Sequence, residues 1–334
     1  VLQHSLFKCL ISKMNCLQNP QSILTEVCMN RYFVRRLLAT IPLMFIISIF
    51  VFMFIHLLPG DPAKTLAGVE ASVEEVEAIR EEFGLNKPIL VQYVDYMKNL
   101  FHGDMGRSLK SNLPVTEMIA SRMHYTLRLV VAGMIWAPFL GIFIGVLCAI
   151  FRGKFFDHFG MLFAITGLSA PGFWLGLMGI ELFSVRLGLL PTTGLDTWKG
   201  YILPSLVMGT GIMAVLARYS RSSMLETLRE DYVRTARAKG QKEFWVMFSH
   251  AFRNSLIQIV TIIGLQIGGL LSGSVITENI FSIPGLGRLL VDSIGYRDYP
   301  VIQGLLMIFA LQYVLINLIV DMLYGVINPK IRYD

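Results

Sequence analysis

The chain has 334 residues, of which 54% are hydrophobic and only 16% charged, and its mean hydropathy is +0.60. A water-soluble fold of this composition would expose large apolar patches, so the composition excludes an ordinary soluble protein and indicates an integral membrane protein. The net charge of +6 is spread over several connecting segments and does not form a single basic patch, which argues against nucleic-acid binding.

Six apolar runs are long enough to cross a bilayer as helices. We expect the spans at residues 37–57, 126–151, 159–187, 201–217, 255–277 and 303–326. The predicted fold class is therefore all-α, integral membrane, with six transmembrane helices. Residues 1–30 form a polar tail in which Met29 is a candidate natural start, 31–57 hold the first span, and 126–330 form a core with the other five.

Residues 58–125 are too long for a plain connection. Ser72-Val73-Glu74-Glu75 has the pattern of a capping box, which predicts a helix from Val73 that Gly84 ends. A second helix is expected over Ile89–Phe101, with one apolar stripe made of Leu90, Tyr93, Val94, Met97 and Leu100. These helices predict a small external helical segment that covers one end of the bundle.

Two of the spans contain helix-breaking or small residues. Ser169-Ala170-Pro171-Gly172 should kink or unwind the third span, and the freed backbone groups should face protein or a cavity. The fifth span carries Gly264, Gly268, Gly269 and Gly273, which favour close helix packing over a lined pathway.

Polar residues within or beside the spans are candidates for the translocation pathway. We name Ser169, Pro171, Glu181, Gln266 and Glu278. Glu181 is expected either at a cavity or interface or in a packing pair. For Glu278 a structural hydrogen bond is the first interpretation, and contact with a substrate or a binding protein is the second. Asp321 lies near a span end, where a snorkelling or paired role is expected.

The distribution of basic residues predicts the orientation. If both termini are cytoplasmic, the cytoplasmic connections hold most of the Lys and Arg residues outside the first external segment. The connection 218–254 alone carries Arg218, Arg221, Arg229, Arg234, Arg237, Lys239, Lys242 and Arg253. We therefore expect an N-in, C-in topology.

The connection 218–254 should fold into three short helices. One is expected to begin at Ser222, one at Asp231, and a third should run from Lys242 to Phe252, with Gly240 ending the second. The third places Phe244, Trp245, Phe248 and Phe252 on one side. An apolar face surrounded by basic residues can dock in a partner's groove with an acidic rim or lie on anionic lipid.

This connection resembles the cytoplasmic loop of bacterial ABC importer permeases, usually written E-A-A with G three residues later. The matching run is Arg234-Thr235-Ala236-Arg237-Ala238-Lys239-Gly240, followed by His250-Ala251-Phe252-Arg253-Asn254. The form with Arg in place of Glu is that of the dipeptide/oligopeptide/nickel permeases. That family commonly has a proline shortly after the Arg-Asn pair; here Gln258 follows Ile257, so the fifth span should begin with less of a kink.

Further motifs extend the resemblance over about residues 30–334, in the subunit type with a long first external segment. They are Leu58-Pro59-Gly60-Asp61-Pro62, Gly103-Asp104-Met105-Gly106-Arg107-Ser108, Phe281-Ser282-Ile283-Pro284-Gly285-Leu286-Gly287-Arg288 and Asn328-Pro329 with Ile331-Arg332-Tyr333. The stretches 189–205 and 297–303 look closest to glutathione-importing permeases.

The resemblance implies a bacterial inner-membrane permease that works with a second homologous permease, two ABC ATPase subunits and an extracytoplasmic solute-binding protein. Its ATPase-coupling residues would be Arg234, Thr235, Ala236, Arg237, Ala238, Gly240, His250, Arg253 and Asn254. The chain has no G-x-x-x-x-G-K-[S/T] sequence, so ATP and Mg²⁺ would be held by the partner ATPase and no cofactor is expected on this chain.

Other function classes find less support in the residues. An ion-coupled secondary transporter should show inverted repeats, and an intramembrane protease should show a Ser/His or paired-Asp arrangement within the spans. We expect neither catalytic residues nor a metal site, because His56, His124, His250 and the four cysteines lack the spacing of such sites. A nickel chelate is an alternative to a peptide as substrate within the same family.

Overall fold

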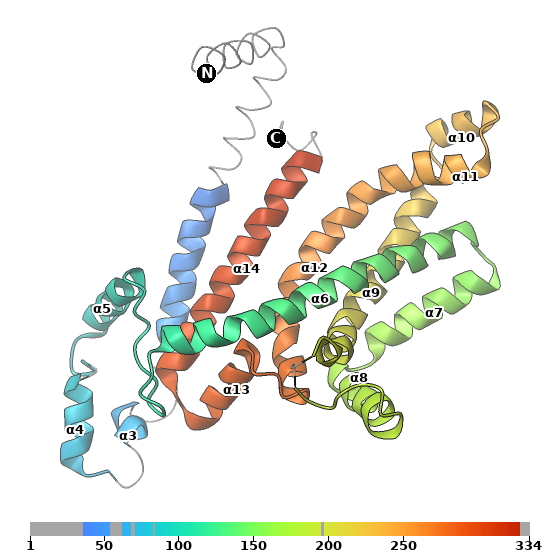
Figure 1. The fold of residues 1–334 in the computed structure, drawn as a ribbon. Coiled ribbons are helices and arrows are strands. Elements are labelled where there is room, and N and C mark those ends of the chain that lie inside the picture. Colours follow the sequence, from blue (N-terminus) through green and yellow to red (C-terminus); the bar gives the residue numbers. More distant parts are fainter. Residues whose placement is uncertain (1–35, 54–61, 68–70, 83, 195–196, 328–334) are drawn as a thin grey trace, which may run out of the picture.

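The structure, a computed structural model, describes residues 36–53, 62–67, 71–82, 84–194 and 197–327 (Figure 1). These residues are mostly helical and contain no strand, only an isolated bridge between Arg107 and Pro114. The predictions for the tail 1–30 with Met29, for residues 58–61 and for the motif at 328–333 fall outside the described residues.

The helices are, in chain order, Arg36–Met53, α3 Pro62–Ala67, α4 Val73–Glu82, α5 Ile89–Phe101, α6 Val115–Ile150, α7 Phe155–Ser169, α8 Gly172–Gly179, the π-helix η1 Ile180–Arg186, α9 Lys199–Thr227, α10 Asp231–Ala238, α11 Glu243–Trp245, the π-helix η2 Val246–Phe252, α12 Arg253–Ile280, α13 Leu286–Tyr296 and α14 Tyr299–Ile327.

Four helices in the described ranges are long and apolar enough to cross a membrane: Arg36–Met53, α6, α9 and α14. Two bent pairs pass the same test together, which allows up to six spans. Phe155–Ser169 and Gly172–Arg186 meet at 102°, and Glu243–Leu256 and Gln258–Leu270 meet at 43°. The break predicted at Ser169–Gly172 is therefore confirmed, and it is far sharper than a kink.

Two helix boundaries differ from the sequence predictions. Helix α6 begins at Val115, not at 126, because Pro114 lies just before its first turn and the charged residues of the first turns join the same helix, which also continues through Pro138. The helix expected to begin at Ser222 does not form, since α9 continues unbroken to Thr227 with Met224 fully buried. The chain also bends by 43° within the first turns of α12, without a proline and close to the wide turns of η2, which are a known cause of kinks. The expectation that this bend is smaller than in the family stays a prediction.

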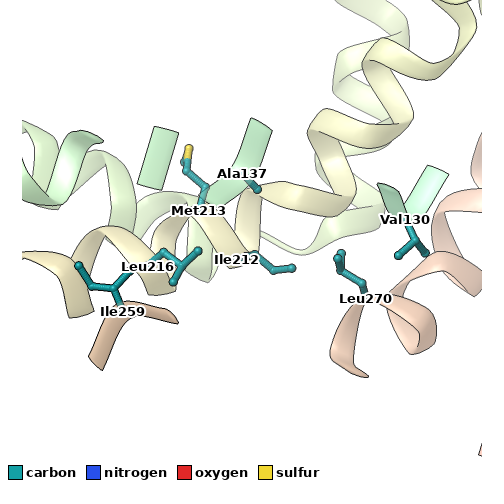
Figure 2. Packing of buried hydrophobic residues seen from close by; sticks show 7 residues of the cluster. All are labelled: Val130, Ala137, Ile212, Met213, Leu216, Ile259 and Leu270. Carbon is teal, nitrogen blue, oxygen red and sulfur yellow. The ribbon is translucent and has the colours of Figure 1, made fainter. Parts of the chain in front are cut away.

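The core lies where α6, α9 and α12 pack together (Figure 2). Its buried members are Val130, Ala137, Ile212, Met213, Leu216, Ile259 and Leu270. Small residues allow this close approach: a Cβ on Gly145 of α6 would lie 2.6 Å from the Cβ of Ser220 on α9. A Cβ on Gly268 of α12 would lie 2.6 Å from the Tyr313 ring of α14, so close packing is confirmed at this glycine.

The ends of the bundle bring distant segments together (Figure 1). At one end, Val146 and Ala149 of α6 pack against Met224 of α9 and Ala251 of η2. Arg36 forms an ion pair with Asp321, with Nη1 and Oδ2 2.9 Å apart, so the paired role expected for Asp321 is confirmed. Helices α8 and α13 lie at the opposite end.

The predicted external segment forms its two helices as expected. The capping box is confirmed, because the Ser72 N–H donates to Glu75 Oε2 at 2.8 Å and the Glu75 N–H donates to Ser72 Oγ at 3.2 Å. The bounds of α5 are also confirmed. Its predicted stripe is wrong in part, because Leu90 and Val94 are exposed while Tyr93 and Tyr96 pack against Phe52 of the first helix. The contact with the first helix is therefore made by aromatic rings and not by Leu90 and Val94.

Candidate functional site

Helix α10 stands apart from the bundle on the ends of α9 and η2, and it begins and ends where the sequence predicts. Val233 and Ala236 are its buried face, and they pack with Val246 of η2 and with Leu228. The other predicted coupling residues on this helix, Arg234, Thr235, Arg237 and Ala238, are exposed. Ala236 therefore anchors α10, whereas its neighbours form an open surface.

Gly240 ends α10 in a turn that demands glycine. Its φ is +78°, a left-handed conformation that other residues adopt only with strain. The Gly240 N–H donates to the Arg237 carbonyl at 2.9 Å, which satisfies one of the last carbonyls of the helix. A Cβ at this position would meet nothing within 4 Å, so the backbone conformation and not the available space requires the glycine.

Three polar contacts hold the turn against α11 and η2. Arg237 donates to both oxygens of Glu243, with Nη2 2.6 Å from Oε1 and Nε 3.1 Å from Oε2. This bidentate pair lowers the pKa of the Glu243 carboxyl and raises the pKa of Arg237. His250 Nε2 lies 2.8 Å from Gln241 Oε1, so the predicted residues Arg237 and His250 both stabilise the same turn.

Asn254 holds the N-terminal end of α10 in place through hydrogen bonds. Its Nδ2 donates to the Tyr232 hydroxyl at 2.9 Å and to the His250 carbonyl at 2.8 Å. Arg253 beside it is exposed. The structure thus brings the two predicted groups, 234–240 and 250–254, into one compact unit, which we call the α10 unit (residues 231–254).

The outer surface of the α10 unit combines cations with aromatic rings. Phe244, Trp245 and Phe248 are exposed, and the Phe244 and Phe248 rings are 4.7 Å apart. Arg234, at 72% side-chain exposure, is 3.5 Å from Asp231, which is itself 97% exposed and screens it weakly. Such a surface suits a groove with an apolar floor and an acidic rim.

An ion pair beneath the α10 unit was missed from the sequence. Arg221 of α9 donates Nε to Asp157 Oδ1 at 2.6 Å and Nη2 to Oδ2 at 2.7 Å. The Gly153 N–H donates to the same carboxylate at 2.9 Å, and the Asp157 side chain is only 3% exposed. The pair joins the start of α7 to the end of α9. A lone acid following Arg152 and Lys154 was the only signal available in the sequence.

Glu278 is fully buried at the opposite end of the bundle. Thr126 of α6 donates its hydroxyl to Oε1 at 2.7 Å, and the Gly287 and Arg288 N–H groups donate to Oε2 at 2.7 and 3.1 Å. The carboxylate thereby caps the first turn of α13, where the partial positive charge of a helix N-terminus stabilises an anion. The first interpretation of Glu278, a structural hydrogen bond, is confirmed.

The other predicted pathway residues lie apart from Glu278. Ser169 and Pro171 are exposed at the break between α7 and α8, and Gln266 is half-buried on α12. Glu181 pairs with Arg186 within η1, with Oε1 and Nε 3.0 Å apart, which is the pairing alternative. No hydrogen bond or ion pair joins these pathway candidates to one another in the described ranges.

Comparison with known proteins decides which family these features belong to. Residues 141–333 match the family described as binding-protein-dependent transport system inner membrane component, and residues 29–130 match the N-terminal part of such membrane components. The chain belongs to this family. It is a permease subunit of an ABC importer, as the motifs around Gly240 indicated, and the ion-coupled transporter and protease alternatives are set aside.

The relatives of this permease include the glutathione transport system permease protein GsiC of Escherichia coli strain K12. The two chains are 49% identical over 305 residues, which cover 91% of this chain and 100% of the relative. The protein of the same name from Salmonella typhimurium strain LT2 is 50% identical over the same lengths.

Two solved structures share the fold of this permease. One is the MetNI methionine ABC transporter in inward-facing conformations, with a TM-score of 0.54, 18% identity, and coverage of 63% of this chain and 96% of that one. The other is an amino acid ABC transporter with histidines, with a TM-score of 0.50, 15% identity, and coverage of 63% and 94%.

Proposed function

We propose that this permease forms half of a translocation pathway for glutathione or a short peptide, and that the α10 unit couples it to a separate ATPase. The complex would contain a second homologous permease, two ABC ATPase subunits and an extracytoplasmic solute-binding protein. The chain would cross the bacterial inner membrane six times, with both termini in the cytoplasm. ATP and Mg²⁺ would be held on the ATPase.

The α10 unit is the observation that carries the proposal. Its inner face is anchored by Val233, Ala236 and Val246, and its outer face presents exposed cations and aromatic rings. The unit is continuous through η2 with α12 and is joined to α9 by only a short turn. A push on α10 would therefore move two spanning helices as levers, switching the pathway between discrete packing arrangements.

The substrate class rests on the relatives named glutathione transport system permease, which this chain matches over their whole length. A nickel chelate is the alternative within the same family. Selectivity would be shared with the solute-binding protein, so the permease sequence alone supports the class of substrate and not a single compound.

Accessibility of introduced cysteines tests the coupling surface. In a chain whose four cysteines are replaced by serine, Ala238→Cys should react with maleimide about tenfold more slowly once the ATPase is assembled. Arg152→Cys, exposed in the connection between α6 and α7, is the matched control and should keep its rate. Equal rates for Ala238→Cys with and without the ATPase would contradict the proposed contact.

The same variants test the orientation. A membrane-impermeant maleimide added to intact spheroplasts should label Thr192→Cys, which is exposed between η1 and α9, and should leave Ala238→Cys unlabelled. Labelling of Ala238→Cys from outside would reverse the proposed topology.

A further inference from the structure

We propose that α5 lies against the lipid bilayer, with Leu90, Val94 and Phe101 in contact with lipid acyl chains. These three residues are called the α5 strip. The sequence placed this helix in a cap over the end of the bundle. The contacts of α5 place it elsewhere.

Helix α5 packs against the membrane-crossing part of the first helix. The Tyr93 hydroxyl lies 2.7 Å from Ser48 Oγ, and the Tyr93 ring makes edge contacts with Phe45 and Phe52 at centroid distances of 6.0 and 5.4 Å. Tyr96 adds a ring contact with Phe52 at 5.7 Å. All three partners lie inside Arg36–Met53, a helix with a mean hydropathy of 2.2 that is long enough to span the membrane (Figure 1). Helix α5 is therefore alongside the span and not beyond its end.

The apolar surface of α5 continues past this contact. Leu90, Val94 and Phe101 are spaced by four and seven residues, so they share one side of the helix. They are 79%, 48% and 83% exposed. Large apolar side chains gathered on one exposed face mark a surface that contacts lipid or another protein.

Lipid is the occupant that the neighbouring surface favours. Ile41, Phe45 and Ile49 form an exposed apolar stripe along the first helix at four-residue spacing. Phe45, which is 51% exposed, also touches Tyr93 of α5. The lipid-facing surface of a spanning helix thus runs on to α5 through one shared contact, as expected for an amphipathic helix held at the membrane.

The polar side of α5 is compatible with this position. Lys87 Nζ lies 2.8 Å from Asp95 Oδ2, and the Gln92 side-chain amide donates to the Leu85 and Lys87 carbonyls at 3.2 and 2.8 Å. These groups are satisfied within their own segment. Lys98 follows Val94 by four residues and so borders the α5 strip, and its long side chain can extend the ammonium toward the headgroups or water.

Spin-label accessibility in liposomes tests the proposal. Nitroxides would be attached at Leu90→Cys and Val94→Cys in the assembled transporter, with Asp95→Cys and Asn99→Cys on the polar side as matched controls. The two strip labels should collide more with oxygen, which concentrates in lipid, than with a water-soluble nickel chelate. The control labels should show the reverse order. Uptake by each variant shows that it is folded.

Two results would overturn the proposal. Strip labels that collide mainly with the nickel chelate would place α5 in water. If addition of the solute-binding protein then protects these labels from the chelate, that protein is the occupant of the strip. Strip labels shielded from both reagents would place the strip in a protein interface. A diazirine-bearing phospholipid, photolysed with the unsubstituted transporter, provides a second measurement, and cross-links in peptides that contain 89–101 are expected.

Discussion

Glu278 shows how backbone groups hold a carboxylate inside this permease. Its oxygens accept from the Thr126 hydroxyl and from two N–H groups at the start of α13, and the Leu286 N–H donates to Thr126 Oγ1 at 2.9 Å. One acid therefore ties α12, α6 and α13 together. Gly285 and Gly287 leave room for it, because a Cβ at either position would contact the Glu278 carboxylate.

Substitution of Glu278 separates its structural role from a role in the pathway. Glu278→Ala should lower the Tm of the purified permease strongly, since each buried donor left without an acceptor costs about 1–3 kcal/mol. Glu278→Gln keeps one acceptor oxygen and should cost less. Both changes are measured by thermal unfolding in detergent. A variant with unchanged Tm and an altered KM for uptake would show instead that Glu278 contacts the substrate.

The buried Asp157–Arg221 pair should contribute more to the stability of the permease than the exposed Glu181–Arg186 pair does. Asp157→Ala leaves a guanidinium that is 29% exposed, so some water can replace the lost partner. We expect a loss of about 1–3 kcal/mol in stability and partial rescue by the exchange Asp157→Arg with Arg221→Asp. Glu181→Ala is the control, because its pair with Arg186 is exposed and should be worth at most about 1 kcal/mol. Equal effects of the two alanine variants on Tm would contradict this account.

At the scale of elements, the Gly240 turn sets the shape of the α10 unit. Gly240→Val forces a β-branched residue into a left-handed conformation, at a cost of about 1–2 kcal/mol, or a factor of about 5–30 in an equilibrium. We expect the transporter to assemble while transport-coupled ATPase stimulation falls by about that factor.

Gly188→Val is the matched control for this strain. Gly188 also has a positive φ, +63°, and open space around its Cβ position, but it follows η1, which continues α8 at the end of the bundle opposite α10 (Figure 1). Stimulation should stay within about twofold of the unsubstituted level in this variant. Full stimulation in Gly240→Val with normal assembly would show that the turn plays no part in coupling.

Local signals predicted local structure well. The capping box at Ser72, the bounds of α5 and the end of α10 before Gly240 each depend on residues within a few positions of one another, and all are confirmed. The start of α6 was misplaced, because apolar composition marks the part of a helix in lipid and not the whole helix.

Contacts between distant segments could not be predicted from the sequence. Asp157 and Arg221 are 64 residues apart in the sequence, and Thr126 meets Glu278 only through the packing of α6 on α12. The Pro171 break was visible, but its 102° angle depends on how α8 packs against the end of α12. The predicted stripe of α5 included Tyr93, but nothing nearby in the sequence indicated that Tyr96, and not Leu90 or Val94, would join it on the inner face.

At the scale of the whole molecule, the two ends of the bundle have different characters. One end carries the α10 unit and the Asp157–Arg221 pair, while the other carries Glu278 with α13. A continuous core of α6, α9 and α12 connects them (Figure 2). A displacement at the α10 unit can therefore reach the opposite end through packed helices.

ATP-driven uptake tests most directly whether this permease imports peptides and is coupled to its ATPase through the α10 unit. The permease would be reconstituted in proteoliposomes with its partner permease, ATPase and binding protein, and the entry of labelled glutathione and of a labelled dipeptide would be followed. We expect uptake of a thiol tripeptide or short peptide that requires ATP on the side of the α10 unit, and a loss of at least about fivefold in Gly240→Val. Uptake that proceeds without ATP or is unchanged in Gly240→Val, or no uptake of any peptide alongside uptake of a nickel chelate, would contradict this expectation.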